Sequence, residues 1–389
     1  MSHPSTPIVI IGSGLAGINV AKNWRKLNST RPLIIITQDS GDSYSKPMLS
    51  TAFAKSQDAQ SLIQQSATEL ADTLTCNMIT NTSVDAIDPE QQLITLDTGK
   101  TIQYHKLVLA LGATANKPQL EGDACDTAIT INNLQDYAAF RERCAIAQHI
   151  TVVGGGLVGC ELANDLSYSS MDVALYNSSE HLLSNFLPKQ IGERLAIALE
   201  TKSARVHNQV SITDINHTSE KRLRVTDSND GSHLTDLVIT ATGLSPNTAL
   251  ALKSGLTTSN GIQTNQYLET SSPNIYALGD CANICGHNLL YVLPLMNSAR
   301  ALAKTLEGEG TAVQLPAMPV TIKTSHWPIT VLPPSSDNSQ GIWVDIESSS
   351  AGQEWHFMAE DKLLGFALAG QSVSKKNALA KQCPALDLG

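Results

Sequence analysis

The sequence predicts an α/β protein with two Rossmann-like βαβ units and a small C-terminal α+β domain. Two stretches, IVIIGSGLAG (8–17) and ITVVGGGLVG (150–159), each run from an apolar strand into three glycines spaced G-x-G-x-x-G. After residue 312 the chain becomes rich in proline and β-forming residues. The segments GIWVDI, EWHFMA and LLGFALAG then alternate like antiparallel strands.

The first unit reads as a strand at 8–11, a glycine turn, a helix over 15–27 and a strand at 32–37. Its strands are unbroken apolar runs, which is typical of parallel strands buried on both faces. The unit recurs at 150–177, with a helix over 157–168 and the strand DVALY. The doubled unit is the one internal repetition that the sequence shows.

Further strand-then-glycine segments at 105–113 and 236–244 close the blocks that the two glycine turns open. A strand at 274–280 and a helix over 296–308 follow, and SSDNSQ (335–340) reads as a turn. We therefore expect three domains. The first is discontinuous and comprises 1–115 and 245–312, the second is 116–244, and the C-terminal α+β domain is 313–389.

Composition excludes several classes of protein. The 389 residues are 42% apolar and 16% charged, as in a globular protein with sizeable cores. A net charge of −10 argues against nucleic acid and anionic membrane surfaces as partners. No apolar run is long enough for a membrane-spanning helix, and the N-terminal MSHPSTP has neither a basic region nor an apolar run of signal-peptide length. Seven irregularly spaced cysteines indicate free thiols and a cytoplasmic location.

The glycines have separate physical roles. Gly12 permits the tight turn off the strand, Gly14 lets a pyrophosphate approach the backbone, and Gly17 lets the helix sit close to the strand. The helix start then offers free N–H groups to the phosphates. Gly154, Gly156 and Gly159 repeat these roles. Two such sites in one chain suggest that electrons pass between two dinucleotides, as between FAD and NAD(P)H.

Three more motifs carry a resemblance to a known family. YSKPMLS (44–50), TATGLSPN (240–247) and NIYALGDCA (274–282) resemble segments of the FAD-dependent pyridine nucleotide oxidoreductases, in which the first site holds FAD and the second NAD(P)H. The resemblance implies that the NAD domain is inserted in the FAD domain. Within that family, GCELANDLS, NLLYVLPLM and MPVTIKT are similar to the rubredoxin–NAD(+) reductases.

The resemblance and the motif spacing together give a set of expected cofactor-binding residues. Asp39 follows the second strand at the distance expected for an acid on the adenosine ribose of FAD, with Thr37 or Gln38 as alternatives. For FAD we expect Ile11, Gly12, Ser13, Gly14, Gly17, Thr37, Asp39, Lys46, Val84, Glu161, Asp280, Val292 and Lys323. For NAD we expect Gly154, Gly156, Gly159, Asn177 and Gly243.

By resemblance, Lys46, Lys323 and Glu161 lie near the flavin and tune it, and no residue acts as acid, base or nucleophile. Each also has an ordinary structural interpretation. Lys46 could be a plain exposed lysine, and Lys323 could be a charge that protects an edge strand. Glu161 could be a favourable charge on the first turn of a helix.

The sequence departs from the family pattern at two places. Where the family often has a glutamate for the NAD ribose, this chain has Asn177, and Glu180 could serve only after a bend. No arginine stands there to take a 2′-phosphate, which favours NADH over NADPH. The second departure is that DSYSKPMLSTAFAK (42–55) has no cysteine. Cys281 and Cys285 read as ordinary buried thiols.

The expected reaction is hydride transfer from NADH to FAD, followed by single electrons to rubredoxin or a similar small iron protein. Reduction of ferredoxin or flavorubredoxin, or of oxygen as an NADH oxidase, remains an alternative. A flavin-binding redox sensor that signals to a partner protein is an alternative from another class. No nucleic acid and no membrane insertion are expected.

Overall fold

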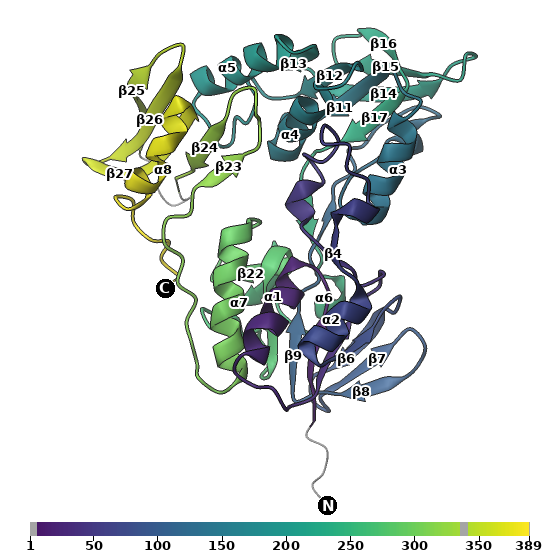
Figure 1. The fold of residues 1–389 in the computed structure, drawn as a ribbon, viewed down its shortest axis with the longest axis vertical. Helices are drawn as coiled ribbons and strands as arrows, with labels where there is room; N and C mark the ends of the chain where they lie inside the picture. The colour runs from purple at the N-terminus through teal and green to yellow at the C-terminus, as the bar shows by residue number, and fades with distance from the viewer. Residues whose placement is uncertain (1–5, 335–340, 389) are drawn as a thin grey trace, which may run out of the picture.

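The computed structural model describes residues 6–334 and 341–388. Its first domain is centred on a parallel sheet in the order β21–β9–β1–β2–β5. These strands are Ile275–Ala277, Lys106–Leu109, Ile8–Ile11, Leu33–Ile36 and Asn77–Ile79. They are the apolar runs predicted from the sequence, and most of their side chains are buried. Helices α1 (Leu15–Arg25) and α7 (Val292–Leu306) lie side by side in the same core (Figure 1).

The second domain repeats this plan around a parallel sheet in the order β13–β12–β11–β17. Its strands are Ala204–Asn208, Asp172–Asn177, His149–Val153 and Leu237–Thr240, and its helices are α3 (Leu134–Cys144), α4 (Leu157–Leu166) and α5 (Lys189–Glu200). Each of the two domains also carries a three-stranded antiparallel meander. The meanders are β6–β8 (Val84–Asp88, Leu93–Leu96, Thr101–Gln103) and β14–β16 (Ile212–His217, Leu223–Asp227, Ser232–Thr235).

The chain crosses between these two domains twice, and the crossings pair with each other. Strand β10 (Ala113–Ala115) is antiparallel to β18 (Leu244–Pro246), and the N–H of Asn116 donates to the carbonyl of Gly243 at 2.9 Å. A paired ribbon at this point has the form of a double linker. We therefore propose that the second domain is an insertion bounded by residues 116 and 244.

The C-terminal domain is an antiparallel sheet in the order β23–β24–β27–β26–β25. Its strands are Val320–Ile322, Ile329–Leu332, Lys362–Gly370, Gly352–Ala359 and Ile342–Ser348. One face shares a core with the second domain, and the other packs under the short helix α8 (Lys376–Ala380). The chain then runs back toward the first domain, where the N–H of Leu386 donates to the carbonyl of Leu315 (Figure 1).

The remaining elements are short. They are β3 (Ser43–Tyr44), β4 (Ile63–Gln65), α2 (Ala67–Leu74), α6 (Ala249–Lys253), β19 (Thr258–Ser259), β20 (Gly261–Thr264) and β22 (Ala282–Ile284). Single 3₁₀ turns lie at Lys46–Met48, Gln60–Leu62, Cys125–Thr127, Gly279–Cys281 and Gln371–Lys375. Within the described ranges, the structure contains no helix with the length and apolar character needed to cross a membrane.

The predicted α/β class with its C-terminal α+β domain is confirmed, but one boundary was wrong. The helix expected from residue 296 begins at Val292. Pro294 falls in its first turn, where a missing N–H costs nothing because that group has no partner inside the helix. Val292, expected shortly before a helix that starts at 296, is therefore the first residue of that helix. The turn expected at 335–340 lies outside the described residues.

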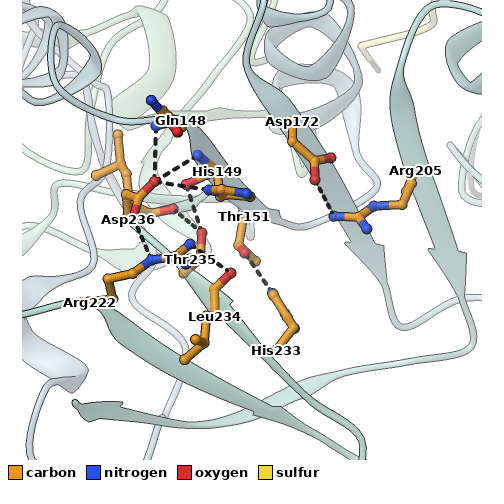
Figure 2. Close-up of polar contacts among 11 residues, drawn as sticks. Gln148, His149, Thr151, Asp172, Arg205, Arg222, His233, Leu234, Thr235 and Asp236 are labelled. Atoms are coloured by element: carbon orange, nitrogen blue, oxygen red, sulfur yellow. Dashed lines mark hydrogen bonds and ion pairs between the residues drawn. The ribbon is translucent and has the colours of Figure 1, made fainter. Parts of the chain in front are cut away.

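One polar cluster lies where β11 and β17 of the second domain begin, at the opposite end of β11 from the glycine turn (Figure 2). The carboxylate of Asp236 accepts the N–H groups of Gln148 and His149, at 2.9 and 2.8 Å, and the Nε–H of Arg222 at 2.8 Å. Burial alone would raise the pKa of Asp236, but these hydrogen bonds lower it to about 2.

Replacement of Asp236 by alanine is expected to lower the free energy of unfolding at pH 7 by about 1–3 kcal/mol, because two backbone N–H groups lose their acceptor. A carboxylate whose pKa is lowered by folding stabilises the protein above its unfolded pKa, and this contribution is lost as the pH falls toward about 2. Denaturant unfolding of both proteins at pH 7 and pH 3 should therefore show a smaller difference at pH 3. An equal or larger difference at pH 3 would contradict this assignment.

Candidate functional site

The first glycine turn leaves an open space at the start of α1. Gly12 has φ of +111°, and a Cβ added there would lie 2.1 Å from the carbonyl oxygen of Ala110. A Cβ on Gly17 would lie 2.0 Å from the oxygen of Gly12, so no side chain fits where the helix packs against the glycine turn. Nothing lies within 4 Å of a Cβ on Gly14, which begins α1 without a side-chain cap. A phosphate fits this space.

The second glycine turn has the same geometry. Gly154 has φ of +120°, and a Cβ on it would meet the oxygen of Ala241 at 2.4 Å. A Cβ on Gly159 would lie 1.8 Å from the oxygen of Gly154, and the position beside Gly156 is open. The start of α4 also lacks a side-chain cap. Both turns therefore present uncapped helix N–H groups beside a space without side chains, which is the donor set that a dinucleotide pyrophosphate requires.

The acid expected after the second strand is tied to the first glycine turn. One oxygen of Asp39 accepts from Thr37 Oγ1 at 2.7 Å, from Ser13 Oγ at 3.3 Å and from the N–H of Gly41 at 3.0 Å. Ile11 is buried as the last residue of β1. The structure thus brings Ser13, Thr37 and Asp39 together at the end of the sheet, with Asp39 exposed. Its second oxygen could accept the hydroxyls of a ribose.

Lys46 and Asp280 are half-buried charges of opposite sign in the first domain. In the described part of the chain, neither charged group makes a hydrogen bond or ion pair to the protein. Burial lowers the pKa of Lys46 and raises the pKa of Asp280, and the attraction between the two groups opposes both shifts. Buried charged groups normally have partners. This pair is therefore suited to a polar ligand between or beside them.

Glu161 joins all three domains. Its carboxylate, only 6% exposed, accepts from Ser50 Oγ at 2.5 Å, from the backbone N–H of Lys323 at 2.9 Å and from Lys323 Nζ at 3.1 Å. Lys323 Nζ also donates to the carbonyl of Pro47 at 2.7 Å. Lys323 follows β23, so it reaches the segment beside Lys46 from the C-terminal domain. Lys323 forms an ion pair with Glu161, whereas Lys46 has no ion-pair partner among the described residues.

Asn177 lies at the end of β12, but its side-chain amide already donates hydrogen bonds to other residues of the protein. The Nδ2 group donates to the carbonyl of Ser179 at 3.0 Å and to Asn208 Oδ1 at 2.8 Å. The loop after it folds back over the glycine turn, where the N–H of Leu183 donates to the carbonyl of Gly155 at 2.9 Å. The chain does bend here, and Glu180 forms an ion pair with Lys189. Asn177 therefore shapes this loop.

The other expected residues lie apart from these clusters. Val84 begins β6, Val292 is the half-exposed first residue of α7, and Gly243, with φ of +103°, lies at the crossing between domains. Two exposed cations, Arg300 and Lys304, follow on α7. Among the described residues, Arg300 donates to Asn297 and Lys304 forms an ion pair with Glu309. None of these residues contacts Lys46 or Lys323 through a hydrogen bond or ion pair in the described chain.

The cysteines take no part in the clusters. All seven are free thiols. Cys281 is buried, as expected, and its Sγ donates to the carbonyls of Leu109 and Leu278. Burial raises its pKa to about 11, which makes it a poor nucleophile at neutral pH. Cys285 is only partly buried, contrary to the expectation that both thiols are buried.

Sequence reasoning missed a polar stripe on α4. Besides Glu161, this stripe includes Asn164 and Asp165, which contact residues far away in the sequence. The signal was present in ELANDLSY, where polar residues recur at the three- and four-residue spacing of one helix face. Residues of this kind are usually assigned to solvent, and burial was not evident without the fold.

Two family models match the chain. Residues 6–324 match the pyridine nucleotide-disulphide oxidoreductase model. Residues 312–383 match the model of a rubredoxin-binding C-terminal domain, which corresponds to the antiparallel sheet and α8.

Among curated relatives, the chain is 42% identical to the rubredoxin-NAD(+) reductase of Alcanivorax borkumensis, over 98% of this chain and 99% of that one. It is 38% identical to the nitric oxide reductase FlRd-NAD(+) reductase of Aliivibrio fischeri, over 96% and 97%. In fold it is similar to putidaredoxin reductase in its covalent complex with putidaredoxin, with a TM-score of 0.88, 22% identity and coverage of 98% and 94%. The chain belongs to the pyridine nucleotide-disulphide oxidoreductase family.

Proposed function

We propose that this protein is an NADH-dependent reductase that holds FAD in the first glycine turn, binds NADH in the second, and passes electrons to rubredoxin. The observation that carries this proposal is the duplication of one phosphate-binding geometry in a chain whose C-terminal region matches a rubredoxin-binding domain. Relatives that match nearly the full length carry names of the same activity.

The first domain would hold FAD through Gly14, Asp39, Lys46 and Asp280. When bound, a flavin can take up a hydride and release electrons one at a time. The protein's own residues supply no acid, base or nucleophile for this chemistry. Lys46 instead supplies a positive charge with no ion-pair partner among the described residues, which stabilises negative charge on a reduced ligand.

A preference for NADH over NADPH is supported by the loop after β12. Residues 177–188 contain no arginine or lysine, and the next cation, Lys189, is already paired with Glu180. A 2′-phosphate would therefore meet a carboxylate and no unpaired cation. The relatives' names specify NAD(+), which agrees with this preference.

The electron acceptor is proposed to bind at the C-terminal domain. A second acceptor, flavorubredoxin, is supported by relatives named FlRd-NAD(+) reductase at 38% identity. Ferredoxin and oxygen lack comparable support. A cytoplasmic location, as the cysteine usage predicts, completes the proposal.

Steady-state turnover tests this function directly. NADH should support rapid reduction of purified rubredoxin, at least tenfold faster than NADPH at equal concentration, because the loop after β12 offers the 2′-phosphate no unpaired cation. Parallel assays with a flavorubredoxin, a ferredoxin and oxygen give the order of acceptors. Slow turnover with every acceptor, together with a persistent complex of NAD and flavin, would instead indicate a redox sensor.

The proposed route contains no cysteine relay, which thiol titration can check. Seven thiols should react in the denatured oxidised protein, and the same number after full reduction by NADH under anaerobic conditions. An increase of two on reduction would reveal a redox-active disulfide, and electrons would then have to pass through sulfur.

Lys46→Met should make the bound flavin harder to reduce, because it removes a positive charge that has no ion-pair partner among the described residues. The midpoint potential is expected to fall by roughly 30 mV or more, about tenfold in the equilibrium for a two-electron couple. The matched control combines Lys323→Met with Glu161→Gln, which deletes an ion pair and leaves the net charge unchanged. If the control shifts the potential as far as Lys46→Met does, charge balance is not the cause.

A further inference from the structure

One helix face is polar where a packed helix is usually apolar. Glu161, Asn164 and Asp165 on α4, and Tyr168 just beyond its end, follow the spacing i, i+3, i+4 and i+7. The first three are 6%, 3% and 5% exposed. Buried polar side chains lower the stability of a fold unless each has a hydrogen-bond partner. The partners of these side chains therefore show which segments this face of α4 positions.

Asp165 holds the segment beside Lys46. Its carboxylate accepts the backbone N–H groups of Phe53 and Ala54, at 2.7 and 3.3 Å. Burial raises the pKa of Asp165, and these two hydrogen bonds oppose that shift. The bonds cross from the second domain to the first and end seven and eight residues after Lys46.

Asn164 holds the C-terminal domain. Its Nδ2 donates to Ser325 Oγ at 3.0 Å, and its Oδ1 accepts the N–H of His326 at 3.2 Å. Ser167 adds a contact to His326 Nε2 at 2.9 Å, and the ring of Tyr168 stacks on His326 with centroids 4.5 Å apart. These bonds end in the loop after β23, within the region that matches a rubredoxin-binding domain.

The two sets of hydrogen bonds start from adjacent residues of α4, the helix that begins at the second glycine turn. We propose that Asp165 and Asn164 are positioning residues for separate half-reactions: Asp165 aligns the nucleotide helix with the flavin segment, and Asn164 aligns it with the acceptor domain. A displacement of about 1 Å can cost about a hundredfold in rate even when the change lies far from the chemistry. This inference rests on the proposed function.

Two variants separate the roles. Asp165→Ala should slow reduction by NADH at least tenfold in stopped-flow mixing, with little change in the dissociation constant for NAD⁺. The pair Asn164→Ala with Ser167→Ala should leave reduction by NADH within about threefold and slow transfer to rubredoxin at least fivefold. Asp165→Asn keeps one of the two acceptor oxygens, which can take the shorter bond from the N–H of Phe53, and should restore part of the NADH rate.

Asp236→Ala is the matched control, because it also removes the acceptor of two backbone N–H groups in the same domain (Figure 2). The hydrogen-bond partners of Asp236, which are Gln148, His149 and Arg222, do not belong to α4. This variant should lower stability and leave both half-reactions unchanged. If it slows them as much as Asp165→Ala does, the effect is general destabilisation and the proposal fails.

Amide hydrogen exchange gives a readout that is independent of turnover. Asp165→Ala should speed exchange in 50–56 and not in 323–327. The double variant Asn164→Ala with Ser167→Ala should speed exchange in 323–327 and not in 50–56. Unchanged exchange, or equal loss of both half-reactions in both variants, overturns the proposal. If Asp165→Ala does not retain flavin, Asp165→Ser takes its place. Normal flavin content but no transfer to rubredoxin in the unmodified protein would refute the proposed function instead.

Discussion

The close crossing of a helix over a strand, made once in each nucleotide-binding domain, is the constraint on which the rest of the structure depends. At Gly17 and Gly159 even one methyl group would overlap a carbonyl oxygen of the turn, at 2.0 and 1.8 Å. Only glycine permits this approach. It places the first uncapped N–H groups of α1 and α4 at the carboxyl ends of their sheets, where ligands of α/β proteins bind.

The close packing of α4 on β11 in the second domain affects more than the ligand that the second glycine turn would bind. Because α4 is fixed on β11, the polar face of the same helix is fixed as well, and Glu161 reaches Ser50 and Lys323 from it. The C-terminal sheet shares a core with the second domain and is held there partly by this face. One helix therefore relates the two nucleotide sites to the proposed acceptor domain, which explains why Glu161, Asn164 and Asp165 are buried on it and why each has hydrogen-bond partners.

Local patterns predicted most of the fold. The apolar strands, both glycine turns and the alternating C-terminal strands were read from periodicity, which is a local property. The start of α7 was placed at residue 296 and lies at Val292, with Pro294 in its first turn. The partners of Asn164 and Asp165 depend on contacts across more than 100 residues, which no local pattern encodes. Asn177 is expected at the NAD site from its position after an apolar strand, and its hydrogen bond to Asn208 on the neighbouring strand could not be predicted from the local sequence.

The central claim is that one chain holds two adenine dinucleotides at once, and a count of binding sites tests it most directly. The dialysed protein is denatured to release and quantify FAD, and the intact protein is titrated calorimetrically with NAD⁺. The account predicts one FAD that resists dialysis and one further site for NAD⁺ in each chain, with no loss of FAD during titration. A single dinucleotide per chain, with NAD⁺ displacing FAD, would contradict it.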